Sequence, residues 1–441
     1  MTRKWDVIIV GGGLAGYVAA NYLIKTNRSI LLIEKGKIVG GRARTTKMND
    51  QCFNLGPHAL YKKGKATAIL EELDIKLNGS SPRLSGILMD NHIEYAAPFS
   101  PSTLFSTQLL NTKERMEWIK VLLKLMTITP EKLANLTFQQ WVRQVTQSKM
   151  VESLLYTLGR LASYCHAPEK VSAKAILSCV KSAMGGVLYL DGGWQTMINQ
   201  LHNRATHSGM EVWQHTHVKQ IEPAQQKQFQ LVLSNGKKIL GEHVICTTGP
   251  HELNDILSKK MVFPQREFLS QITPIRGATL DIALTQLPNQ NQLFAMDIKA
   301  PLYYSVHSAF ARLSNHPRNA ILHVFKYHHP DQHMDGAIIK KELEQFLDVL
   351  QPGWQEYVIF KRFLPPHITV NQRLPQIGDE QKILDCQTEI PGLYIAGDWA
   401  SPPHSILAEA AITSGKQAAE KVILNEKRHN DGDYKSRLSA I

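Results

Sequence analysis

The sequence predicts an α/β protein in which a helix-covered parallel sheet carries a second, α+β domain as insertions. Three observations predict this class. A strand-like run at residues 5–10 enters a glycine-rich turn and then a helical stretch at residues 14–26. A second buried strand, Ser29–Ile33, follows at once and completes a β-α-β unit of a parallel sheet. A strand and a helix between residues 392 and 424 end the pattern, after a long mixed segment.

Composition limits the classes to which this chain can belong. Its 441 residues are 43% hydrophobic and 20% charged, which suffices for two or three domains at roughly 100–200 residues each. The formal charge of +12 is scattered rather than gathered in a basic block. We therefore expect no nucleic-acid partner, while weak peripheral attachment to a membrane stays open. Five cysteines without a C-x-x-C pair argue against a disulfide framework or a zinc site and predict a cytoplasmic protein.

The N-terminal apolar run superficially resembles a signal peptide or a membrane span. Residues 5–24 are nearly all apolar, but three consecutive glycines, Gly11–Gly13, interrupt them, and the pattern changes there from β-type to helical. We therefore interpret the run as a strand, a turn and a helix.

The central part of the chain mixes helical and strand-rich segments. From residue 91 to about 184 the pattern is mainly helical, and the pairs Asn111/Glu114 and Thr137/Gln140 are typical of capping boxes that open helices.

Strands and helices then alternate up to the C-terminus. A helix is expected at 194–208, and Asn235-Gly236 predicts a type I′ turn between the strands of a hairpin. Further on, we expect a strand at 320–327 and a helix at 337–350. The last dozen residues are polar and are expected to be frayed.

The turn after the first strand predicts a dinucleotide-binding site. Gly11, Gly13 and Gly16 satisfy the pattern G-x-G-x-x-G. The first glycine permits the tight turn, the second lets the backbone approach a pyrophosphate, and the third allows helix and strand to pack closely. The helix that opens with Leu14 and Ala15 offers its N-terminal N–H groups to the phosphates.

An acidic residue ends the second strand, as such a site requires. Glu34, followed by Lys35, can accept hydrogen bonds from both ribose hydroxyls of an adenosine and would repel a 2′-phosphate, so NADP is disfavoured. This unit alone does not separate FAD from NAD.

Two further motifs separate the two cofactors through a resemblance. Residues 40–45 read Gly-Gly-Arg-Ala-Arg-Thr, and residues 392–398 read Gly-Leu-Tyr-Ile-Ala-Gly-Asp. Together with the N-terminal glycines, and in the same order, they resemble the flavin-containing amine oxidase superfamily, which also holds phytoene desaturases and protoporphyrinogen oxidases. The resemblance covers essentially the whole chain. It implies FAD as cofactor and a Rossmann-type FAD-binding domain with an inserted α+β substrate domain.

The resemblance also implies how the chain divides. The FAD-binding domain is expected at residues 1–75, 187–254 and 386–428, the substrate domain at 76–186 and 255–385, and a flexible tail at 429–441.

Taken residue by residue, the resemblance implies contacts along the cofactor. Arg42 would approach the pyrophosphate, where a guanidinium suits phosphate oxygens. Gly56, Pro57 and His58 would pass beside the isoalloxazine ring. The backbone of Val218 would form a hydrogen bond with adenine.

The C-terminal motif would complete the site. Gly397 and Asp398 would lie near the ribityl chain and the pyrophosphate. Leu407, in the segment 405–410 that opens the last helix, would face flavin N1 and the C2 carbonyl, where the positive end of the helix dipole stabilises the reduced flavin. Relatives often have glycine where Ala410 stands, so this sequence departs from the pattern of the superfamily at that position.

Several other motifs have two interpretations each. Residues 191–195, Asp-Gly-Gly-Trp-Gln, resemble an element of the desaturases or are a well-capped helix start. Lys326 is either a lysine beside flavin N5 or, in the preferred interpretation, an ordinary strand-end lysine. The histidines at 328, 329 and 333 indicate a solvated loop rather than a metal site. The apolar face of residues 116–126 would touch a membrane, line an oily pocket or, most commonly for such a pattern, pack as plain core.

These observations predict an FAD-dependent oxidoreductase that transfers a hydride between a substrate carbon and flavin N5. We expect a desaturase-like enzyme with a hydrophobic substrate, because the motifs at 56–58, 191–194 and 397–405 favour desaturases and no paired aromatic cage is seen. Flavin amine oxidases and protoporphyrinogen oxidases are the alternatives within the superfamily. An NAD-dependent dehydrogenase and a non-catalytic flavin-binding protein are the alternatives outside it. No acid–base residue is assigned, and the electron acceptor and oligomeric state stay open.

Overall fold

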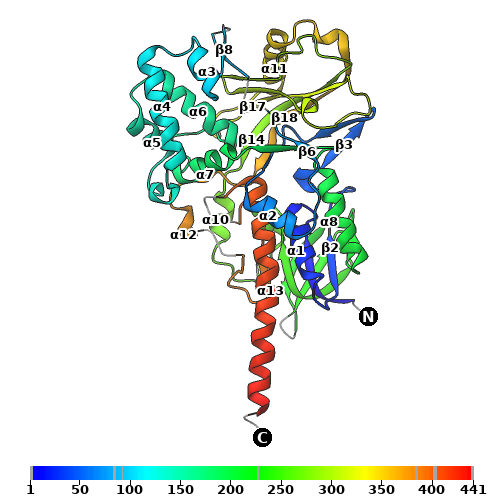
Figure 1. Ribbon diagram of the computed structural model, residues 1–441. Coiled ribbons are helices and arrows are strands. Elements are labelled where there is room, and N and C mark those ends of the chain that lie inside the picture. The colour runs from blue at the N-terminus through cyan, green and yellow to red at the C-terminus, as the bar shows by residue number, and fades with distance from the viewer. Residues whose placement is uncertain are drawn as a thin grey trace.

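The computed structural model describes residues 3–82, 86–91, 93–225, 228–382, 386–400 and 405–438. Figure 1 shows two parts: one around the N-terminal strands, and one that combines a helical cluster with a second sheet. Segments from the two ends of the chain meet in the first part, because the last helix, in red, lies beside the N-terminal elements, in blue.

The first part is built on a mainly parallel sheet. Its strand order is β10-β2-β1-β13-β12-β11, and β19 pairs with residues 244–246 of β13, on the same edge as β12 and beyond the end of the β12 pairing. The pairs of β1 with β2 and β13, of β10 with β2 and of β13 with β19 are parallel, and only the β11-β12-β13 meander is antiparallel. The strands are β1 (Lys4–Val10), β2 (Ile30–Ile33), β10 (Glu211–Trp213), β11 (Val218–Pro223), β12 (Phe229–Leu233), β13 (Lys238–Cys246) and β19 (Leu393–Ile395).

Helices cover this sheet, as the unbroken apolar character of its strands requires. They are α1 (Leu14–Leu23), α2 (Lys65–Glu72), α8 (Gln195–His207) and α13 (Leu407–Leu438), with α9 (Pro250–Ile256) and α10 (Arg266–Gln271) nearby. The first and last helices pack closely, since a Cβ on Gly415 would lie 2.4 Å from the carbonyl oxygen of Ala15. The backbone of α13 is helical to Leu438 and extends beyond the body (Figure 1). The flexible tail expected from residue 429 stays a prediction. Residues 439–441 lie outside the described residues.

The second sheet has the strand order β18-β14-β17-β16-β15-β7-β8. Its strands are β7 (Ile87–Asp90), β8 (Ile93–Ala96), β14 (Ile275–Leu284), β15 (Phe294–Asp297), β16 (Leu302–Val306), β17 (Ala320–Tyr327) and β18 (Val358–Asn371). Helix α11 (Gly336–Leu350) packs on it, because Ile339, Leu343 and Phe346 recur at helical spacing on its buried face. The strand and the helix predicted at 320–327 and 337–350 are confirmed.

The helical cluster beside this sheet contains α3 (Pro101–Ser106), α4 (Thr112–Thr127), α5 (Phe138–Val145), α6 (Lys149–Ser163) and α7 (Ala173–Met184). Both predicted capping boxes are confirmed, at the start of α4 and of α5. In α4 the buried side chains are Trp118, Val121 and Leu125, whereas Met116 and Leu123 are exposed. The interpretation of the 116–126 face as plain core is therefore wrong for Met116, Leu123 and Met126, whereas Ile119 and Leu122 are partly buried against the core.

Shorter elements connect these parts. They are β3 (Thr45–Met48), β4 (Gln51–Asn54), β5 (Leu60–Tyr61), β6 (Gly79–Ser80), β9 (Val187–Leu190), α12 (Asp379–Lys382) and the 3-10 turns η1 (Gly41–Ala43), η2 (Pro130–Leu133), η4 (His307–Ala309) and η5 (Trp354–Tyr357). Strand β9 pairs with β5 and β6.

The hairpin between β12 and β13 is present, but its turn differs from the predicted type. Gly236 has φ of +79°, whereas Asn235 does not have the positive φ that a type I′ turn needs at both central residues. The N–H of Leu233 donates to Lys237 O at 2.9 Å, and the N–H of Gly236 donates to Leu233 O at 2.9 Å. Because Ser234 adds a residue, the loop has three residues with a left-handed glycine at its end.

Candidate active site

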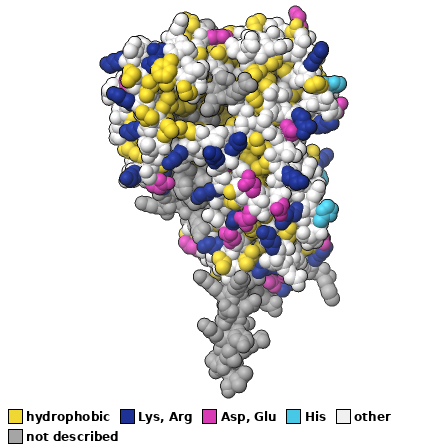
Figure 2. All heavy atoms as spheres, viewed as in Figure 1, with side chains coloured by type: hydrophobic (Ala, Val, Ile, Leu, Met, Phe, Trp, Pro, Cys, Tyr) yellow, Lys and Arg dark blue, Asp and Glu magenta, His cyan; other side chains and the backbone are white. Residues whose placement is uncertain are grey.

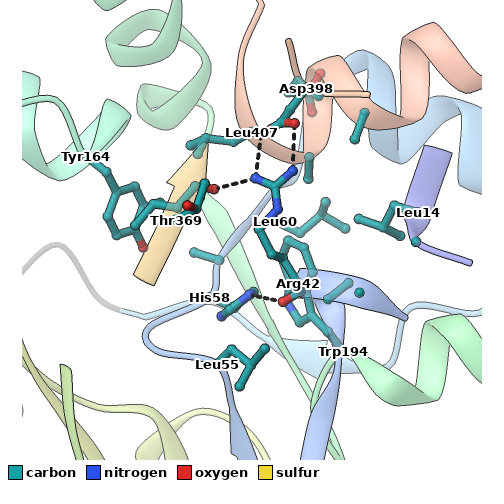
Figure 3. Close-up of a pocket in the computed structure, with 18 of the residues that line it drawn as sticks. Leu14, Arg42, Leu55, His58, Leu60, Tyr164, Trp194, Thr369, Asp398 and Leu407 are labelled. Carbon is teal, nitrogen blue, oxygen red and sulfur yellow. Dashed lines mark hydrogen bonds and ion pairs between the residues drawn. The ribbon is translucent and has the colours of Figure 1, made fainter. Parts of the chain in front are cut away.

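One cavity of about 780 Å³ is lined by residues of both parts of the molecule. From the first part come the turn after β1, the ends of β2 and β13, and the start of α13. From the second come α4, α6, α7 and the strands β14 to β18. Figure 3 shows side chains from these distant segments pointing toward one another. A pocket at the carboxyl ends of parallel strands is the usual place for a ligand in such a fold.

The glycine turn leaves room on one side and none on the other. Gly11 has φ of +115°, and a Cβ there would lie 2.4 Å from Thr247 Oγ1. A Cβ on Gly16 would lie 2.1 Å from the carbonyl oxygen of Gly11, so this glycine brings helix and turn together. A Cβ on Gly13 would meet nothing within 4 Å, and Gly13 lines the cavity. The backbone at Gly13 is thus open to a ligand, which fits a bound pyrophosphate.

A carboxylate is fixed beside this turn. Glu34 accepts hydrogen bonds from the N–H of Gly12 at 2.7 Å and from the N–H of Gly36 at 2.6 Å. Lys35 donates to Glu252 at 2.7 Å. Glu34, Lys35 and Val218 all line the cavity, which places the predicted adenosine contacts at the same end of it.

A bidentate ion pair lies further along the cavity. Arg42 donates to both carboxylate oxygens of Asp398, at 2.5 and 2.6 Å, and to Val370 O at 2.9 Å (Figure 3). The N–H of Gln372 also donates to Asp398, at 2.8 Å. Burial lowers the pKa of Arg42, but the Asp398 carboxylate outweighs this effect and raises it. The guanidinium therefore stays charged, as phosphate binding requires.

The segment around His58 is held by its imidazole. Nδ1 lies 2.9 Å from Gly56 O, and Nε2 lies 3.1 Å from Arg42 O. Burial lowers the pKa of His58 more than these two carbonyl groups raise it. A neutral imidazole donates only one of the two hydrogen bonds. Because both ring nitrogens face the backbone, His58 positions the segment, and its ring packs against Trp194 with centroids 4.8 Å apart.

A buried ionic network lies behind this segment. Asp281 is fully buried and accepts hydrogen bonds from Thr279 at 2.9 Å and from Arg362 Nε at 3.1 Å. His323 Nδ1 lies 2.6 Å from the same carboxylate. Burial alone would raise the pKa of Asp281, but His323 and Arg362 lower it. Thr279 lines the cavity, so the network forms part of the wall's support.

Helix α13 begins at the cavity. Leu407 has φ of +58°, which is unusual for a bulky residue, and its N–H donates to Asn371 Oδ1 at 2.7 Å. Leu407, Ala408 and Glu409 line the cavity, so the positive end of the helix dipole is directed at it. Glu409 also accepts from the N–H of Ala66 at 3.1 Å, and burial raises the pKa of Glu409.

The part of the cavity lined by the second sheet and the helical cluster is aromatic and aliphatic. Tyr164 donates to Pro57 O at 2.6 Å, and Tyr303 donates to Ser305 Oγ at 2.7 Å. Phe325 and Tyr327 point into the cavity from alternate positions of β17. The other lining side chains here include Leu122, Leu125, Leu158, Leu161, Ala162, Val180, Ala183, Met184, Val187, Tyr189 and Phe294.

Comparison with known proteins decides the family. The family of flavin-containing amine oxidoreductases matches residues 14–423, nearly the whole chain. The chain belongs to this family. It is therefore a flavin-dependent oxidoreductase, and the predictions of FAD as cofactor, of an enzyme and of a Rossmann-type fold class are confirmed.

Individual relatives of this flavin-dependent oxidoreductase match over short segments. L-amino-acid oxidase of Crotalus adamanteus is 38% identical over 73 residues, which are 16% of this chain and 14% of that enzyme. Carotenoid 3,4-desaturase of Haloarcula japonica is 40% identical over 52 residues, 12% of this chain and 10% of the other. The chain thus spans only a small part of the curated relatives that it matches.

Solved structures resemble the whole fold. An oxidoreductase from Methanosarcina mazei has a TM-score of 0.76 at 16% identity, covering 95% of this chain and 99% of the other. A variant of putrescine oxidase has a TM-score of 0.75 at 14% identity, covering 96% and 100%. At these identities the similarity shows the fold alone.

The flavoprotein's predicted cofactor contacts gather around one cavity. The lining includes Gly11, Gly13, Leu14, Ala15, Glu34, Lys35, Arg42, Pro57, His58, Val218, Gly397, Asp398 and Leu407. Gly16 and Gly56 do not line it: Gly16 packs against Gly11, and Gly56, with φ of +92°, lies against Thr279. The cofactor contacts of all these residues remain predictions.

The motifs with two interpretations are placed as follows. Trp194 lines the cavity, and the start of α8 is capped by Asn54, whose Oδ1 accepts from the Trp194 N–H at 3.0 Å. Lys326 points away from the cavity and pairs with Glu342, which favours the ordinary strand lysine. His329 contacts Glu169 at 2.8 Å, and the described residues hold no cluster of three metal-binding side chains. Residues 401–404 of the C-terminal motif lie outside the described residues.

Sequence reasoning missed two groups of lining residues. Thr247, Thr248 and Gly249 follow β13 directly and line the cavity beside the glycine turn. The sequence could have indicated these three residues, because they directly follow a buried strand that is parallel to β1, and ligands bind at the carboxyl ends of such strands. The tyrosines of the apolar part carried no such signal, since aromatic residues in strands usually pack as core.

Proposed function

We propose that this enzyme is a desaturase-like FAD-dependent oxidoreductase that exchanges a hydride between a carbon of a hydrophobic substrate and flavin N5. One observation carries the proposal. Of the described residues, those that α4, α6, α7 and the strands β14 to β17 contribute to the cavity include no charged side chain. Such a wall favours an apolar molecule, since a cationic ligand would lose its hydration there without gaining a carboxylate partner.

The chain's own residues hold and orient the reactants. When bound, FAD would supply a two-electron acceptor, so that the substrate could lose a hydride from one carbon and a proton from the neighbouring carbon as a C=C bond forms. Gly13, Arg42 and the start of α13 would hold its charged groups, with the last facing the pyrimidine ring. Phe325 and Tyr327 would press the substrate against the ring and exclude water.

Anaerobic reduction of the flavin tests the proposal. The purified holoenzyme is mixed with polyenes or other isoprenoids, with porphyrinogens and with simple amines, and the bleaching of the flavin band is followed. We expect bleaching by an apolar compound and none by amines. Rapid bleaching by amines alone, or bleaching by porphyrinogens alone, would replace the proposal with the corresponding oxidase, and no bleaching by any compound would favour a non-catalytic flavoprotein.

Two variants on one strand show whether the apolar wall takes part. Phe325→Leu should slow reduction by the bleaching substrate about tenfold, because it changes the shape of the wall without adding a polar group. Lys326→Ala, on the opposite face of β17, is the matched control and should leave the rate unchanged. If both variants are reduced at the same rate, the apolar part of the cavity is not the substrate site.

A further inference from the structure

Helix α4 exposes an apolar stripe to solvent. Met116, Leu123 and Met126 are 54%, 59% and 63% exposed, although a globular helix normally buries such residues. Phe105 of the adjoining helix α3 is 68% exposed. The guanidinium of Arg115 ties the two helices together by donating to Leu104 O at 2.9 Å. In Figure 2, hydrophobic side chains gather at the upper left, over this helical cluster, with Lys and Arg side chains between them.

The stripe is continuous with the wall of the cavity. Leu122 lines the cavity, and at 3.6 residues per turn Met126 is its neighbour on the helix surface. Leu123 follows on the exposed side, one turn from Ile119, and Met116 lies about two turns before it on the same face. From the cavity outward, α4 therefore presents one unbroken apolar surface.

Positive charge flanks the stripe on its far side. Lys113, Lys120 and Lys124 are exposed, and Lys120 lies one turn after Met116. The acidic residues of the helix are held by the segment that follows α5, although Glu117 lies one turn after Lys113 and interacts with its charge. Glu114 accepts from Ser148 Oγ at 3.2 Å, and Glu117 accepts from the N–H of Gln147 at 3.1 Å.

The opposite border of the surface belongs to helix α7. Met184, at its C-terminal end, is 45% exposed and also lines the cavity. Lys181 joins the ends of α7 and α4 by donating to Ile128 O at 3.1 Å. The exposed apolar side chains thus lie next to the cavity rather than at a remote place.

We propose that this α3–α4 surface, formed by Phe105, Met116, Leu123 and Met126 with the three lysines, docks on a bilayer that contains anionic lipids. The apolar side chains would enter the boundary between headgroups and acyl chains, while the lysines contact anionic headgroups. No helix of the described residues is long and apolar enough to cross a membrane, so the contact is peripheral. Because the α3–α4 surface lies beside the cavity, an apolar molecule would be able to pass between the acyl chains and the apolar part of the cavity without crossing water.

Vesicle sedimentation with the full-length holoprotein tests this proposal. The vesicles contain phosphatidylcholine alone or with phosphatidylglycerol. We expect binding to the anionic vesicles that weakens with added salt, and a loss of about tenfold or more in the variant M116Q/L123Q/M126Q. The variant K113Q/K120Q/K124Q should lose about fivefold per lysine, on anionic vesicles only. The matched control is V262Q/I338Q, which removes side chains that are 85% and 67% exposed elsewhere and should bind like the parent.

The opposite results are equally clear. Binding of the α4 variant that equals that of the control would overturn the proposal, as would a parent protein that leaves the anionic vesicles unbound. Light scattering tests whether a second copy of the chain covers this surface instead. If the parent protein is a dimer and the α4 substitutions convert it to a monomer, the surface is an interface between two copies. The flavin absorption spectrum, measured on every variant, shows that each is folded.

Discussion

Replacing Gly13 and Gly16 with alanine, one at a time, should separate cofactor binding from folding. At Gly13 the added methyl group meets nothing within 4 Å, and its φ of −87° suits any residue. We expect Gly13→Ala to change the unfolding free energy of the flavin-free protein by less than about 1 kcal/mol. The same methyl group takes the space through which the backbone approaches a pyrophosphate, so affinity for FAD should fall about tenfold or more.

At Gly16 we expect the substitution to lower the stability of the flavin-free protein. The new Cβ would lie 2.1 Å from Gly11 O, a contact that backbone movement must relieve. Overpacking of this kind costs about 1–3 kcal/mol, and the better helix propensity of alanine returns about 1 kcal/mol of it. The flavin-free Gly16→Ala protein should therefore melt a few degrees lower. Thermal melts of the flavin-free proteins and titration with FAD, followed by quenching of flavin fluorescence, measure both effects. A Gly13→Ala protein that binds FAD like the parent would refute the reasoning.

Three further predictions follow from the site. Arg42→Lys should lower FAD affinity about tenfold, because lysine cannot form the bidentate pair with Asp398; an unchanged dissociation constant in the same titration would contradict this. Asp281→Asn should destabilise the protein by about 3–5 kcal/mol, since it removes the buried carboxylate that pairs with buried His323 and partly buried Arg362. Because the pKa of Asp281 is lowered on folding, its contribution is present above about pH 4 and is lost as the pH falls further; the variant should lack that part of the acid dependence in urea unfolding. Lys326→Met should leave the pH profile of flavin reduction unchanged, and a shifted profile would return this lysine to the active site.

The parts of the fold that follow local rules could be predicted from sequence. Strand β1, the glycine turn and helix α1 are a contiguous unit, and each glycine has a steric role that other residues cannot fill. The capping boxes at Asn111 and Thr137 likewise depend on residues three positions apart. These features need no knowledge of what packs against them.

The remainder depends on contacts between segments that are distant in the sequence. The hairpin at Asn235 was expected in the right place, but one additional residue changed the turn type. Helix α4 has apolar residues on two of its faces, and only one of these faces can pack against the core. Trp118 and Leu125 lie on the buried face, whereas Met116 lies on the exposed one. The partner of Arg42 lies 356 positions further along the chain. No local sequence pattern predicts the ion pair between Arg42 and Asp398.

The close contact of α13 with α1 has a consequence for biosynthesis. Gly415 rests on the backbone of Ala15, so helix α1 obtains this packing partner only after the intervening residues, about 400, have been made. Until then the apolar N-terminal strand and helix are available to chaperones or to aggregation. A nascent chain that stops before residue 407 would hold the glycine turn but lack the opposite wall, so cofactor loading should wait until α13 has been made.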